Sequence, residues 1–204
     1  MTTGTDLALR VAARVHDPSQ VELTAAQYLA YVNDANDDLR SAGWLLKEDE
    51  DRSTVFVQGV YYYPVPANFA YIRLLREEAE QPPNSYDLII PYHQWRLESL
   101  LGVANIVFDG TVFFPLPGKH LQVTGQMRPV NPLIGATVIT PGMESFLRER
   151  AVAYAADFLA GGHSELAQQR ERLATRSWAL SNQMLAYHPQ EFRCRPNSQR
   201  VPGA

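Results

Sequence analysis

The sequence is poor in the features that most often reveal a chemical activity. It holds a single cysteine, Cys194, among 204 residues, so it cannot form an internal disulfide or a multi-cysteine zinc site. It has no Walker-type phosphate loop, no Gly-x-Gly-x-x-Gly turn and no Gly-x-Ser-x-Gly nucleophile elbow. No apolar run approaches the roughly 20 residues that span a bilayer, and the first residues lack the pattern of a signal peptide. We therefore expect a protein made in the cytoplasm that does not bind a membrane.

Clusters of positive charge and of metal ligands are also missing. The formal net charge is -4, with a pI near 5.7, which argues against a surface that grips nucleic acid phosphates throughout. The five histidines are dispersed along the chain, and no His-x-x-x-His pair is present. We expect no enzymatic activity, no catalytic residue, no metal site and no cofactor.

Helical patterns occupy both ends of the sequence. A short helix carries Leu7, Val11 and Val15 on one face. A second begins at Thr24, where Gln27 completes a capping box, and stops near Gly43. Its outer face is acidic, with Asp34, Asp37 and Asp38, which favours a solvated surface over the lining of a channel.

Two long helices are predicted after residue 142. The first covers about 143–160, with apolar residues spread widely enough to predict burial on more than one side. Ser164 caps the second, whose apolar positions predict the face turned toward the protein. Those positions are Leu166, Leu173, Trp178, Leu180, Met184 and Leu185.

The middle of the chain has alternating apolar and polar residues, which are typical of strands. Asp109-Gly110 suits a type I′ hairpin turn and Pro117-Gly118 a type II turn, so we expect a three-stranded meander over 104–126. A charged turn is expected from Lys47 to Arg52. The strands are predicted near 53–58, 60–65, 69–77, 86–91, 104–109, 111–115 and 119–126.

These patterns predict an α+β fold, with an α-helical bundle made from the N-terminal and C-terminal helices, an inserted antiparallel β-rich domain and an extended C-terminal tail. The tail is polar and arginine-rich, which is typical of a segment that orders on binding. The expected boundaries are 1–51 for the first helices, 52–130 for the β insertion, 131–188 for the connection and last helices, and 189–204 for the tail.

The tyrosine-rich segment from Tyr61 to Arg76 has three interpretations. We favour a place in the core or at an interface between subunits, because alternating tyrosines fill one face of a sheet. A second hypothesis is a small-molecule enzyme or binding protein with a pocket near Tyr62, His93, Trp95 and His120. A third is a DNA-binding accessory protein that stacks its tyrosines on bases.

The order of several segments resembles the head-to-tail adaptor, or connector, proteins of tailed bacteriophages. The resemblance is one of pattern and order over roughly residues 5–188, and none of its segments is a catalytic motif. The segments are Tyr28-Leu-Ala-Tyr-Val-Asn-Asp-Ala-Asn-Asp-Asp-Leu39 to Trp44-Leu, Tyr61 to Arg76, Tyr86-Asp-Leu-Ile-Ile-Pro-Tyr-His-Gln-Trp-Arg-Leu97, Gly125-Gln-Met-Arg-Pro129, and the helix that begins at Pro141.

The resemblance implies a structural virion protein at the neck of the particle. It implies a homo-oligomeric ring, commonly a dodecamer, which forms under the portal protein in the host cytoplasm and receives stopper or tail proteins at its other end. Genomic DNA would pass through the ring without sequence-specific binding. The resemblance further implies that the tail docks on the portal, through Phe192, Arg193, Arg195 and Arg200. Interfaces with neighbouring subunits or tail proteins are expected at Tyr61, Tyr62, Tyr63 and Trp95.

Overall fold

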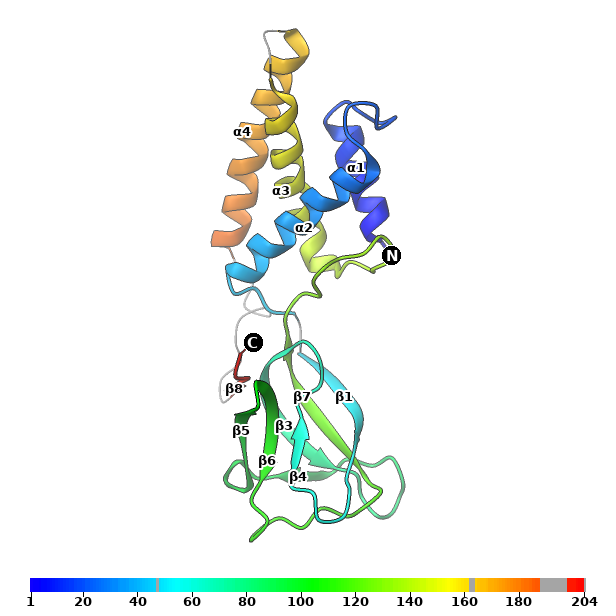
Figure 1. Ribbon diagram of the computed structural model, residues 1–204, viewed down its shortest axis with the longest axis vertical. Coiled ribbons are helices and arrows are strands. Elements are labelled where there is room, and N and C mark those ends of the chain that lie inside the picture. The colour runs from blue at the N-terminus through cyan, green and yellow to red at the C-terminus, as the bar shows by residue number, and fades with distance from the viewer. Residues whose placement is uncertain (47, 162–163, 188–197, 204) are drawn as a thin grey trace. The chain divides into compact units, whose positions relative to one another are not determined.

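The computed structural model describes residues 1–46, 48–161, 164–187 and 198–203 and confirms the α+β class (Figure 1). Helices and antiparallel sheets occupy two separate compact units. The helical unit contains the described residues of 1–44 and 129–187. The β unit contains those of 45–128 together with 198–203.

The helical unit consists of α1 (Gly4–Arg14), α2 (Ala25–Ser41), α3 (Pro141–Leu159) and α4 (Glu165–Ala186). α3 is its centre, because α1, α2 and α4 all contact it. α3 and α4 lie side by side as an antiparallel pair (Figure 1). As predicted, α3 is buried on several sides, and its alanines allow its neighbours to approach closely.

The helix ends follow the capping signals in the sequence. The Thr24 and Gln27 capping box is present, with both reciprocal hydrogen bonds formed, and Gly43 ends the turn after α2 at a φ of 76°. The Ser164 side chain accepts the backbone N–H of Ala167, as expected of an N-cap. These local predictions were right because each depends on hydrogen bonds within a single turn of helix.

The inward face of α4 differs from the predicted one. Its fully buried residues are mostly small, whereas the large apolar residues lie on its flanks and Leu166 is exposed. The physical reason is the alanine-rich surface of α3, against which small side chains allow two helices to pack closely. The buried positions of α4 are Ala167, Arg170, Ala174, Ser177 and Ser181.

A buried carboxylate organises the loop between α1 and α2. Asp17 accepts hydrogen bonds from the backbone N–H groups of Val21, Glu22 and Leu23 and from the Tyr28 hydroxyl, at 2.8 to 3.2 Å. Burial acts to raise the pKa of Asp17, but these four hydrogen bonds outweigh it and hold the pKa below its ordinary value. The loop therefore depends on one ionised side chain.

The β unit contains two antiparallel sheets that share one hydrophobic core. The larger sheet has the order β1-β7-β3-β4, and β8 also pairs with β3; the smaller has the order β2-β6-β5 (Figure 1). The core includes a cluster of aromatic rings, in which Phe56 contacts Tyr63, Phe108 and Phe113. The strands are β1 (Glu48–Val55), β2 (Tyr62–Pro64), β3 (Phe69–Glu77), β4 (Leu88–Ile90), β5 (Trp95–Leu100), β6 (Val103–Phe108), β7 (His120–Met127) and β8 (Gln199–Arg200).

The predicted meander over 104–126 is wrong, because 111–115 is not a strand. The Asp109 side chain accepts the backbone N–H and the hydroxyl of Thr111, and the Asp109 carbonyl accepts the N–H of Phe113. This turn places the Phe113 ring against Phe108, with their centroids 4.7 Å apart. The Asp-Gly signal thus forms a turn that returns the chain to the core, and no hairpin follows it.

The strand β5 was missed by the sequence analysis, and it forms the real hairpin with β6. Leu101 and Gly102 connect the two strands, with φ values of 53° and 80°, and Leu100 pairs with Val103. Two successive positive φ values are typical of a type I′ turn, where asparagine and glycine are preferred. A fully exposed leucine at the first position gave no turn signal.

We expect Leu101→Asn to stabilise the β unit by about 1 kcal/mol, because asparagine tolerates the left-handed conformation better than leucine. Denaturant unfolding followed by the fluorescence of Trp95, which lies in the core of this unit, would measure the change. Leu100→Asn is the matched control, because Leu100 is the adjacent residue and is also exposed, but its φ is not positive. Equal effects of the two substitutions would contradict the explanation by backbone strain.

The charged segment before residue 53 is also different from the prediction of a turn. From Glu48 onward it belongs to β1, which pairs with β7 at one edge of the larger sheet. Its acidic side chains find polar partners on the sheet, since Glu48 binds Arg73 and Glu50 accepts the amide of Gln122 at 2.7 Å. An edge strand tolerates such charges because one side of it meets solvent.

The described part of the tail is folded, which corrects the expectation of an extended segment for residues 199–201. Tyr71 pairs with Arg200 and Ile72 with Gln199 in β8. The Val201 side chain is buried in the core of the β unit, and its backbone N–H donates to Ala70 at 2.8 Å. Backbone pairing with β3 and the buried Val201 side chain together attach β8 to the sheet.

Candidate assembly surfaces

The aromatic residues predicted at an interface fall into different environments. Tyr63 and Trp95 lie in the core of the β unit, where the Tyr63 hydroxyl accepts the backbone N–H of Val57 at 2.9 Å. Tyr61 is half-buried, whereas the Tyr62 side chain is 59% exposed. Tyr62 is therefore the member of this group whose ring is most accessible to a partner.

The tail residues predicted to dock on the portal are only partly covered by the structure. Arg200 lies in β8 and is exposed at the edge of β3. Phe192, Arg193 and Arg195 lie outside the described residues.

The residues of the alternative pocket do not share one environment. Trp95 is in the core and Tyr62 is exposed on β2. His93 is exposed in the short 3-10 helix η1 (Tyr92–Gln94), and not in a strand. His120 lies on β7, where its Nδ1 is 2.9 Å from the carbonyl oxygen of Arg52. The structure therefore gives no geometric support to a joint site of these four side chains.

The described residues contain no group of three or more His, Cys, Asp or Glu side chains placed to hold a metal ion. No helix in the described part of the chain has the length and apolar character needed to cross a bilayer. No known protein family and no curated protein matches this chain. Its surfaces must therefore be interpreted from their own chemistry.

The first surface of interest joins α2, α3 and α4 through stacked aromatic rings. The ring of Tyr31 stacks on Tyr154 and also meets Phe158, with centroids 6.4 Å apart in both pairs. Tyr154 in turn contacts Trp178 edge to face at 5.1 Å. The Phe158 side chain remains 65% exposed. A large ring that is held in place and still faces solvent is typical of an interface residue.

Carboxylates surround these rings. Asp34 is exposed one turn from Tyr31, and Asp157 is exposed next to Phe158. Asp34 is exposed overall, but partial burial of its carboxylate raises its pKa, and the nearby charges of Asp37 and Asp38 raise it further. We call this surface the acidic–aromatic face; its residues are Tyr31, Asp34, Tyr154, Asp157 and Phe158. Repulsion from Asp37 and Asp38 acts on Asp34 in the free chain, so a cation placed beside Asp34 would be stabilised.

Arg150, a buried arginine next to this face, contacts both an aromatic ring and a carboxylate. The guanidinium of Arg150 lies 4.4 Å from the centroid of the Trp178 ring, and its Nε is 3.3 Å from a carboxylate oxygen of Asp38. Asp38 also accepts the Tyr154 hydroxyl at 2.8 Å. Burial and this hydrogen bond raise the pKa of Tyr154 to about 12. The protein thus combines arginine, aromatic ring and carboxylate in one place, which fixes the positions of Tyr154 and Trp178.

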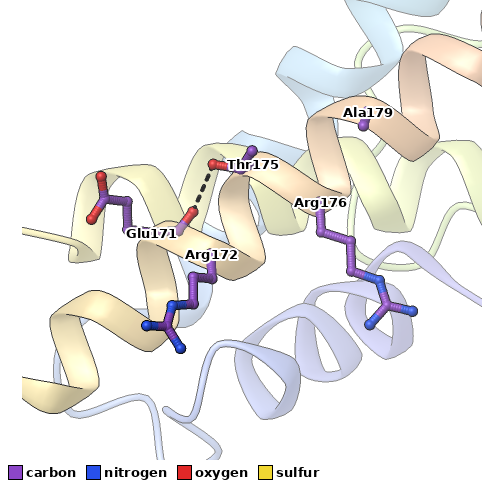
Figure 2. Close-up of a pocket in the computed structure, with 5 residues that line it drawn as sticks. All are labelled: Glu171, Arg172, Thr175, Arg176 and Ala179. Atoms are coloured by element: carbon purple, nitrogen blue, oxygen red, sulfur yellow. Dashed lines mark hydrogen bonds between the residues drawn. The ribbon is translucent and has the colours of Figure 1, made fainter.

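The second surface lies on the outward side of α4, where a shallow hollow of about 520 Å³ is lined by Glu171, Arg172, Thr175, Arg176 and Ala179. Figure 2 shows the guanidinium groups of Arg172 and Arg176 on the same side of the helix, with the Glu171 carboxylate turned away from them. We call Arg172 and Arg176 together the arginine face. Neither residue has a hydrogen bond or ion pair within the described chain.

The remaining arginines of the helical unit behave differently. Arg10 binds Glu144, Arg14 binds Glu149, and Arg40 donates to the carbonyl of Pro129. Arg170 is buried, donates to the Val15 carbonyl at 3.0 Å and binds Glu22. The arginine face is therefore the place on the described helical unit where positive charge lacks a partner.

The sequence indicates an acidic side of α2, which we interpreted as a solvated surface, and an arginine-containing outer face of α4, but neither was predicted to be an assembly surface. A usable signal existed for the first one. Tyr31 and Asp34 are three residues apart, as are Tyr154 and Asp157, so each pair lies on one side of its helix. The proximity of the two helices, which brings the pairs together, had no local signal.

Proposed function

We propose that this chain is a head-to-tail adaptor of a tailed bacteriophage, a structural virion protein that forms a ring under the portal, extends the DNA channel and joins the capsid to the tail. In this proposal the helices from both ends of the sequence form the bundle, and the β unit is an insertion between them. The tail docks on the portal, while stopper or tail proteins bind the opposite end.

The observation that carries the proposal is that the helical unit has two different surfaces of opposite charge. A ring requires a heterologous interface, in which one patch of each subunit contacts a different patch of the next. The acidic–aromatic face and the arginine face share no residue and have opposite charge. The resemblance in segment order supports the same assignment.

The test is binding to the portal protein encoded near this chain, measured by pull-down and native mass spectrometry. Because β8 is part of the β unit, truncation at residue 188 would also damage the sheet. The sharper variant is Arg193→Glu with Arg195→Glu in the full chain, which reverses charge in the tail and leaves β8 in place. The matched control is Arg52→Glu with Arg96→Glu, two exposed arginines of the β unit.

We expect the full chain and the control to form a ring-sized complex with the portal, and the tail variant to bind at least about tenfold more weakly. Equal binding by the tail variant would remove the docking role of these arginines. The absence of any portal complex with the unaltered chain would overturn the adaptor assignment.

A further inference from the structure

We propose that the arginine face of one copy of this chain binds the acidic–aromatic face of the next copy. The proposal rests on the adaptor function, and it names the residues through which the subunits contact each other. Arg172 and Arg176 would each place a guanidinium group against an aromatic ring and a carboxylate of the neighbouring copy.

The arginine face has the chemistry and spacing for this contact. Arg172 and Arg176 are four residues apart, so they lie about one helical turn, roughly 6 Å, apart along α4. Both are exposed and lack an ion-pair partner within the described chain. The hollow beside them, which is lined in part by Thr175 and Ala179, leaves space for a protruding ring. Arginine is enriched at interface hot spots because it combines charge with a flat stacking surface.

The acidic–aromatic face offers the complement. The Asp34 carboxylate has no hydrogen bond or ion pair within the described residues, and partial burial together with the charges of Asp37 and Asp38 raises its pKa. Phe158 is the most exposed ring of the face, and Asp157 is exposed beside it. The underlying arrangement of Arg150, Trp178 and Asp38 shows that this chain already uses the same three groups together. The contact between copies would repeat that arrangement at the surface.

A second copy fits the arginine face better than nucleic acid does. Two arginines beside the Glu171 carboxylate offer few phosphate contacts, whereas binding to a DNA duplex draws on many. A negatively charged protein face with exposed rings satisfies both the charge and the flat apolar surface of each guanidinium. Because the two faces are different, binding leaves a free face at each end of a growing assembly, which can close into a ring.

Two variants test the contact. One is Arg172→Glu with Arg176→Glu, which reverses the arginine face. The other is Asp34→Arg with Asp157→Arg, which reverses the charge of the acidic–aromatic face. The Arg52→Glu and Arg96→Glu variant controls for the change in net charge, and circular dichroism checks that each protein is folded. Assembly is measured by analytical ultracentrifugation up to about 1 mM, and by counting copies per portal ring with native mass spectrometry.

We expect each variant alone to lose self-assembly, with its dissociation constant raised at least about tenfold. Mixed in equal amounts, the two variants should assemble again, because the intact acidic–aromatic face of one meets the intact arginine face of the other and their two reversed faces are also of opposite charge. The protein carrying all four substitutions should regain the ring, since its two faces have exchanged charge. Loss in each variant alone, with recovery both in the mixture and in the protein with all four substitutions, is specific to a contact between unlike faces.

Normal assembly by either variant alone would overturn the proposal, as would a mixture of the two variants that stays monomeric. An unaltered chain that stays monomeric, both alone and with the portal, would overturn it as well. Salt-sensitive duplex DNA binding that is lost in Arg172→Glu with Arg176→Glu would assign the face to nucleic acid instead. Portal binding with unaltered ring size in both variants would reject this contact and leave the adaptor function standing. Rings that form through these faces but do not bind the portal would support this contact and reject the adaptor function.

Discussion

Replacing Asp17 with alanine is expected to lower the free energy of unfolding of the helical unit by about 3 kcal/mol. The substitution leaves three backbone N–H groups and the Tyr28 hydroxyl without their acceptor in a buried loop. Each buried donor that loses its partner costs free energy, and the backbone donors cannot turn away. The loop also places Glu22, which binds Arg170 of α4, so the damage should extend to the packing of α4.

The same carboxylate makes stability depend on pH. Asp17 has a pKa below its ordinary value of 3.8 in the folded protein. Its contribution is therefore fully present above about pH 4 and is lost as the pH falls through the lowered folded pKa, since the unfolded state binds the proton more readily. Urea unfolding between pH 2.5 and 7, followed by circular dichroism at the helical wavelength, measures both effects.

Tyr28→Phe is the control for Asp17→Ala, because it removes only one of the four donors. We expect it to cost about 1 kcal/mol and to keep most of the acid dependence. Two results would contradict the proposed role of this carboxylate in organising the loop. One is a smaller loss of the free energy of unfolding in Asp17→Ala than in Tyr28→Phe, and the other is an acid dependence in Asp17→Ala equal to that of the unaltered chain.

Gly125→Ala is expected to destabilise the β unit by at least about 3 kcal/mol and to disrupt its folding. A Cβ atom at this position of β7 would lie 2.1 Å from the carbonyl oxygen of Tyr71 and 3.0 Å from the Cα of Ile72. Both obstacles are backbone atoms of β3, so no side chain can rotate to make room. The added methyl group must therefore push β3 and β7 apart, at the centre of the larger sheet.

Thermal unfolding and amide hydrogen exchange of β3 and β7 measure this loss. Gly161→Ala is the matched control, because its Cβ would have no atom within 4 Å and its φ is not positive. We expect the control to change stability by no more than about 0.5 kcal/mol. Native-like exchange protection of β3 in Gly125→Ala would show that the sheet can absorb the methyl group.

Local signals in the sequence predicted most of the helical unit, and long-range pairing explains what they missed. The capping box at Thr24 and the cap at Ser164 act within one helical turn, so neighbouring residues suffice to identify them. In the β5–β6 hairpin, Leu101 occupies a turn position at which asparagine or glycine would have indicated a hairpin. Asp109-Gly110 indicated a hairpin, but these residues form a turn that is stabilised by the Asp109 side chain.

The candidate surfaces were harder to predict, because they depend on which helices are neighbours. Tyr31 and Tyr154 are separated by more than a hundred residues, and only the packing of α2 on α3 stacks their rings. On α4, apolar periodicity indicated a face of leucines, whereas close packing on α3 selected small residues. The emphasis on the tyrosines of the β unit followed from composition, and two of the four aromatic residues chosen lie in a core.

Each compact unit is assembled from two separate stretches of sequence, with residues 45–128 interrupting the helical unit and α3 and α4 interrupting the β unit. A protease that cuts once between the units therefore releases neither of them. After such a nick, the two fragments should migrate together in a native gel and separate only when denatured. The same interleaving means that fragments produced independently, 1–128 and 129–204, carry complementary halves and can be tested for reconstitution on mixing.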